Sequence, residues 1–131
     1  MKNKLLITTA LVALVSASNA YADALNIADG DTHKITANEM VDSLEMTGGS
    51  LTGAADVDGS MTVSGNANIS GGTVNLTGHY DSENEDNEKY SDISATGKVT
   101  ISGDKTVVNI EQADISAQNG FEISGGKITM G

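Results

Sequence analysis

The densest group of ionisable side chains is the acidic tract from Asp81 to Asp92, which holds six carboxylates. Clustered carboxylates can collect Ca²⁺ weakly, or they can present a charged recognition loop. The tract contains no aliphatic residue, and a strongly charged segment without apolar side chains has nothing to bury in a core. We therefore predict a solvated loop here rather than a metal site.

Two further patterns resemble parts of functional sites. The run Asp56–Ser60 (DVDGS) resembles the start of a calcium loop, but the later ligands and the bidentate Glu at fixed spacing are missing. His33 and His79 are the only histidines and are far apart in the chain, and no Gly-x-Ser-x-Gly context surrounds a serine. The sequence therefore predicts no catalytic, cofactor-binding or metal-binding residue, and we expect the protein not to be an enzyme.

The N-terminus has the pattern of a secretory signal peptide over residues 1–22. Lysines precede an apolar run from Leu5 to Val15, and Ala20–Ala22 supplies a small-x-small site, which places cleavage before Asp23. The apolar run is much shorter than the ~20 residues that span a bilayer. We expect an exported chain without a transmembrane anchor, located outside the cell or at its surface, with the periplasm as the alternative.

Charge and composition narrow the choice of partner and fold. After cleavage, five lysines and no arginine stand against eighteen carboxylates, a net charge of −13. Such a chain is poorly suited to nucleic acid or anionic membranes. Only 3% of the residues are aromatic and there is no cysteine, so neither bulky aromatic packing nor disulfides can stabilise an ordinary small domain. A stack of repeats avoids that problem, because each repeat buries its aliphatic side chains against its neighbours.

A five-residue motif recurs along the chain: apolar, any residue, apolar, Ser or Thr, then Gly. It occurs at Leu44–Gly48, Ala67–Gly71, Val99–Gly103 and Phe121–Gly125. Its second apolar positions are Met46, Ile69, Ile101 and Ile123, at steps of 23, 32 and 22 residues. Apolar residues two apart share one face of a strand, and Gly suits a tight corner. The motif predicts coils of about 22 residues, with the excess of about ten placed in one acidic loop at about residues 79–92.

The fold class that we predict is all-β: a right-handed parallel β-helix, or β-solenoid, over residues 44–131. The inward ladder is then Met46, Ile69, Ile101 and Ile123, and the outward row is Glu45, Asn68, Thr100 and Glu122. A left-handed β-helix is the alternative, because Gly53, Gly59, Gly65 and Gly71 keep a six-residue spacing, but the phase is lost after the loop.

Residues 23–43 carry no clear repeat, and we assign them to an N-terminal cap segment. Two alternatives remain open for their structure. Thr36–Glu39 has capping-box spacing and predicts a short helix over the first coil. The other alternative is irregular strand, with Ile35 and Val41 paired onto the stack.

The runs Ile69–Gly78 (ISGGTVNLTG) and Ile123–Gly131 (ISGGKITMG) resemble passenger domains of bacterial autotransporters and related surface adhesins. The resemblance covers about residues 44–131 and includes no part of the translocator barrel of that family. It implies a right-handed β-helix, export, and a surface role in adhesion or as a stalk.

The function that we expect is a non-catalytic structural or adhesive module of the bacterial cell surface, either whole or as a fragment of a longer adhesin. The alternative is a soluble acidic binding module for Ca²⁺ or a cationic ligand, in the periplasm or extracellular space. The expected partners are a second copy, stacked on the uncapped C-terminal coil, or ligands on a host or cell surface. No cofactor is expected.

Overall fold

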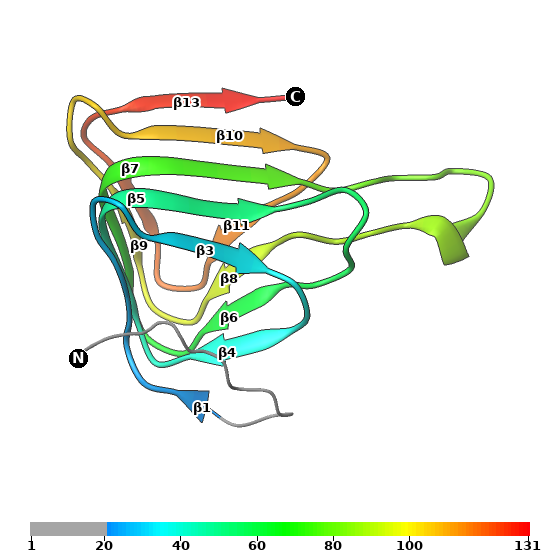
Figure 1. The fold of residues 1–131 in the computed structure, drawn as a ribbon, viewed down its shortest axis with the longest axis horizontal. Coiled ribbons are helices and arrows are strands. Elements are labelled where there is room, and N and C mark those ends of the chain that lie inside the picture. The colour runs from blue at the N-terminus through cyan, green and yellow to red at the C-terminus, as the bar shows by residue number, and fades with distance from the viewer. Residues whose placement is uncertain (1–20) are drawn as a thin grey trace.

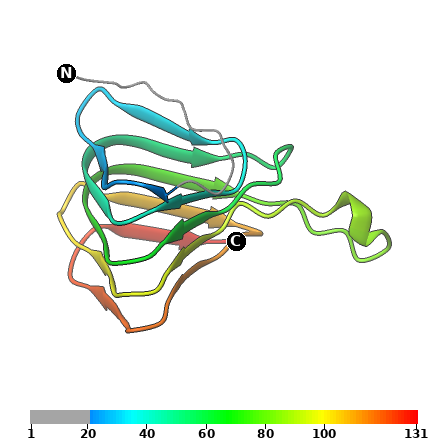
Figure 2. The same ribbon diagram turned by 90° about the horizontal axis from the view of Figure 1, so that it is seen from below.

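A computed structural model describes residues 21–131, which form five stacked coils of parallel β-strand (Figures 1 and 2). Almost all of the predicted signal peptide lies outside the described residues. The described part contains thirteen strands and a single turn of 3₁₀ helix. The predicted β-solenoid is therefore confirmed.

Each complete coil has three faces. The first face consists of β1 (Tyr21–Ala22), β4 (Glu39–Val41), β6 (Met61–Val63), β8 (Ile93–Ala95) and β11 (Ile115–Ala117). The second face consists of β2 (Leu25–Ile27), the first part of β5 (Leu44–Gly53), the first part of β7 (Ala67–Thr77), β9 (Val99–Ile101) and β12 (Phe121–Ile123). The third face consists of β3 (Thr32–Ile35), the later parts of β5 and β7, β10 (Val107–Glu111) and β13 (Lys127–Met130).

The solenoid is right-handed. In Figure 1 the chain runs clockwise around each coil, from the third face to the first and then to the second. Figure 2 shows the same molecule from below, with the first coils at the top and the last at the bottom. The top of Figure 2 corresponds to the front of Figure 1, so each coil lies behind the preceding coil in Figure 1. A clockwise path that recedes from the viewer is a right-handed helix, so the left-handed alternative is wrong.

The inward ladder follows the predicted register. Met46 pairs with Ile69, Ile69 with Ile101, and Ile101 with Ile123. The row begins one coil earlier than predicted, because Ile27 pairs with Met46. All of these side chains are buried except that of Ile123 in the last coil, which is 57% exposed. The ladder is thus one column of the hydrophobic core that runs through the stack.

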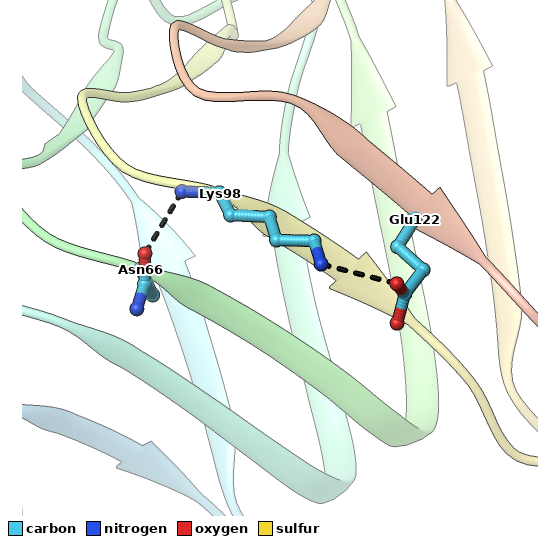
Figure 3. A network of polar contacts seen from close by, with 3 residues as sticks. All are labelled: Asn66, Lys98 and Glu122. Carbon is cyan, nitrogen blue, oxygen red and sulfur yellow. Dashed lines mark hydrogen bonds and ion pairs between the residues drawn. The ribbon is translucent and has the colours of Figure 1, made fainter.

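The outward row is also in register, and its side chains connect neighbouring coils. Glu45 pairs with Asn68, whose Nδ2 donates to the Glu45 carboxylate at 2.9 Å. Nearby, three successive coils are joined by the contacts in Figure 3. The backbone N–H of Lys98 donates to Asn66 Oδ1 at 2.8 Å, and Lys98 Nζ lies 3.0 Å from Glu122 Oε2. Because this ion pair is largely exposed, it adds little to stability.

The corner between the second and third faces explains the Ser/Thr-Gly part of the motif. In each of the five coils one glycine in this corner has a positive φ, a conformation that side chains disfavour. These glycines are Gly30, Gly49, Gly72, Gly103 and Gly126. In three of these coils the glycine of the five-residue motif directly precedes the glycine with the positive φ. At Gly71 a Cβ would lie 2.2 Å from the carbonyl oxygen of Thr47 in the preceding coil. The motif therefore marks a tight turn and a close approach of two backbones.

Residues 23–43 belong to the sheets. β2 and β3 pair with β5, and β4 pairs with β6. Ile35 and Val41 are buried with the rest of the core. Of the two alternatives the structure has strand; the helix indicated by the capping-box spacing does not form, because Val41 and its neighbours bury apolar side chains against the next coil.

The acidic loop leaves the stack where the third face meets the first. β7 ends at Thr77 and β8 begins at Ile93, so the intervening residues form the projection at the right of both ribbon views. Residues 83–87 are all exposed. The predicted position of the insertion is confirmed, and the strands on either side of it keep their register.

Candidate functional site

The base of the acidic loop is a short two-stranded ribbon closed by one antiparallel bridge. The backbone N–H groups of His79 and Lys89 each donate to the carbonyl oxygen of the other, both at 2.9 Å. Residues from both arms of this base, His79 with Tyr80 and Lys89 with Tyr90, line one groove. The hydroxyl of Tyr90 donates to the Glu88 carboxylate.

Both tyrosines of the ribbon are fixed to the coils at their backbones. The N–H of Tyr80 donates to Gln112 Oε1 at 2.8 Å, and the N–H of Tyr90 donates to Asp58 Oδ1 at 3.1 Å. The carbonyl of Tyr90 accepts from the N–H of Gly59 at 2.9 Å. Gln112 has φ 51°, the one positive φ at a non-glycine position in the described chain. The insertion therefore leaves the stack from a base tied to the coil on each side.

An open groove lies beside this base. Its polar and aromatic lining is formed by His79, Tyr80, Lys89, Tyr90, Asp92, Gln112 and Asp114. The side chains of Tyr80 and Tyr90 are 66% and 50% exposed. An exposed pair of aromatic side chains is unusual in a chain with so few aromatics, and exposed tyrosines are typical of binding surfaces.

The electrostatic environment of the groove is negative. Burial raises the pKa of Asp92, the nearby carboxylates of Asp114 and Asp58 raise it further, and the N–H of Asp114, 2.9 Å from Asp92 Oδ1, opposes the shift. The pKa of Tyr90 is raised by its hydrogen bond to Glu88 and by the charges of Glu88, Glu85 and Asp58. Two carboxylates of the loop, Glu85 and Glu88, and one from a neighbouring corner of the stack, Asp58, thus act on Tyr90.

At the tip of the loop the acidic tract organises its own backbone. The Asp81 carboxylate accepts from the N–H groups of Glu83 and Asn84, at 3.0 and 3.1 Å, and from Asn87 Nδ2 at 3.3 Å. These bonds lower the pKa of Asp81, and the Glu83 bond has the largest effect. Asn84 caps the 3₁₀ turn η1 (Glu85–Asn87). In residues 21–131 no three His, Cys, Asp or Glu side chains are placed to hold a metal ion.

The other motifs found in the sequence have local contacts. Asp58 of the DVDGS run accepts the Tyr90 N–H, so its role in the structure is to anchor the loop. His33 Nε2 in β3 lies 2.6 Å from Glu39 Oε1 in β4, whereas His79 is in the base of the insertion. The structure does not bring the two histidines together.

The tyrosine pair was not predicted as a site from the sequence, although a signal was present. Two of the three tyrosines in the chain flank the acidic tract, at positions 80 and 90. Their symmetrical placement at the two ends of an insertion indicates a closed base. Gln112 and Asp114 carried no signal, because they come from the next coil and reach the groove only through the stacking.

Comparison of the chain with protein-family models, with curated proteins and with solved structures gave no significant match. The class of protein is therefore defined by the fold: a right-handed parallel β-solenoid with one acidic insertion. Among the residues described, no helix has the length and apolarity needed to cross a bilayer.

Proposed function

We propose that this protein is an exported, non-catalytic β-solenoid that serves as a structural or adhesive module of the bacterial cell surface. The observation that carries the proposal is the column of buried aliphatic side chains that runs in register from the first coil into the last. Such a stack is a scaffold built from contacts between neighbouring coils, which suits one segment of a stalk or spacer. Its resemblance to autotransporter passenger repeats favours the same role.

The proposed partner is a second copy, stacked on the outer edge of β11, β12 and β13. In the described chain each of these strands pairs on one side only. The inward side chains at this edge include Ile123 and Met130, which are 57% and 71% exposed. Unpaired strand edges with apolar side chains favour the addition of further strands. Among residues 21–131, β2 and β3 also pair on one side only, so another copy would add head to tail.

A second candidate function is an acidic binding module, and the groove at the base of the loop favours it. It places two exposed aromatic rings among carboxylates, an arrangement that the structural role does not need.

Locating the native protein in the bacterium that makes it tests the surface proposal. Intact cells are labelled with antibody against the chain, and the N-terminus of the labelled protein is determined by mass spectrometry. We expect surface labelling and an N-terminus at Asp23. Protein that retains residues 1–22 and is found only in the cytosol would overturn the proposal.

A further inference from the structure

The groove at the base of the acidic loop has properties that match one chemical class of ligand. Two tyrosine rings are held at the surface by backbone bonds to Gln112 and Asp58, from neighbouring coils. The faces of such rings carry partial negative charge and attract ammonium and guanidinium groups. Because the backbones are fixed, the rings are presented without the cost of ordering a flexible loop.

The charges around the rings favour the same ligand. Asp92 and Asp114 line the groove, and the carboxylates of Glu88 and Asp58 lie close enough to act on Tyr90. Lys89 is the one lysine in the lining, and the carboxylates of Asp92 and Asp114 outnumber its charge. An anionic ligand would be repelled by these carboxylates, whereas a cation gains from both the rings and the carboxylates.

We propose that this groove binds lysine side chains of a basic polypeptide, with Tyr80 and Tyr90 as the cation–π platform and Asp92 and Asp114 as the charge partners. A polypeptide suits an open groove better than a small ammonium ion, because successive lysines can contact the tyrosines and the exposed acidic tip together. The proposal is independent of whether the solenoid resides at the cell surface.

The probe is acetyl-Lys-Lys-Lys-amide, titrated into the purified chain by calorimetry, with the tyrosine ring signals followed by NMR. We expect binding that weakens with added salt and shifts the ring signals of Tyr80 and Tyr90. The same peptide with Nε-acetylated lysines keeps its size and loses its charge, and we expect it not to bind.

Two double variants separate cation–π attraction from simple apolar contact. Y80F/Y90F keeps both ring faces and should bind within about 2-fold of the unmodified protein, whereas Y80L/Y90L keeps apolar area and should weaken binding by about 2- to 5-fold per ring. The tyrosines are exposed, so neither variant should alter the fold, which circular dichroism checks. As a matched charge control, E83Q/D86N removes two tip carboxylates and leaves the rings; it should lower the salt dependence while the ring signals still shift.

Equal affinity of the leucine and phenylalanine variants would overturn the assignment of the rings. Equal binding of the acetylated peptide would show that the groove recognises neutral chains, and would overturn the assignment of the ligand.

Discussion

Replacing Ile101 with alanine tests the inward ladder directly. Ile101 is 1% exposed and lies between Ile69 and Ile123 in the column of paired strands. Truncating a buried isoleucine removes its transfer free energy and leaves a cavity, at a cost of about 2–5 kcal/mol. The solenoid provides its own control, since Ile123 occupies the same ladder position in the last coil and is 57% exposed. Because folding removes less than half of the Ile123 side chain from water, Ile123→Ala should lower the free energy of unfolding by about 1 kcal/mol or less.

Urea unfolding measures both variants. With a slope of about 1–3 kcal/mol per molar urea, Ile101→Ala should lower the midpoint by roughly 1–2 M, and Ile123→Ala by only a few tenths. The measurement uses circular dichroism and tyrosine fluorescence together, because coincident curves establish a single cooperative transition.

The two variants give distinct refutations. If Ile101→Ala changes the free energy of unfolding by no more than Ile123→Ala does, and both changes are small, the ladder does not hold the coils together. If both changes are large, Ile123 is covered in solution. A midpoint that then rises with protein concentration would identify a second copy as the cover.

Two further substitutions test the close backbone contact and the buried acid. Gly71→Ala places a Cβ 2.2 Å from the Thr47 carbonyl oxygen, so the coils must separate; we expect a loss of about 1–3 kcal/mol in the same urea assay, and an unchanged midpoint would contradict the corner geometry. The raised pKa of Asp92 means that its ionised form is disfavoured in the folded state, so its effect lowers stability as the pH rises above the ordinary value of 3.8, and the loss is complete above the folded pKa. Asp92→Asn should therefore raise the melting temperature at pH 7 and make no difference near pH 3, where the acid is protonated in both states; a lower melting temperature at pH 7 would show that its charge is needed.

The repeat of the coils could be predicted from the sequence because its signal is local and redundant. Each motif places an apolar pair inward and a glycine at a corner, and the steps between Met46, Ile69, Ile101 and Ile123 fix the register without any long-range information. The excess in one step located the insertion. The pattern did not extend to residues 23–43, where Ile27 and Ile35 join the core without a Ser/Thr-Gly corner of the usual form.

The groove could not be predicted in the same way, because its parts come together through the stack. Gln112 and Asp114 follow Tyr80 by more than thirty residues, and each sits in an ordinary-looking corner. Their proximity depends on how the corner after β10 lies against the base of the loop. Periodicity predicts the strands but not the arrangement of side chains where two corners of different length meet.

The direction of the strands has a mechanical consequence. Every strand runs across the axis along which the coils stack, and the strands of the inner coils are bonded both to the coil before and to the coil after them (Figure 2). A force that pulls the two ends apart along this axis acts in line with the hydrogen bonds between coils, so it opens them one after another. The end coils should peel away first, each extending the chain by one repeat at a similar, modest force. A protein built in this way yields gradually under tension instead of breaking at one threshold.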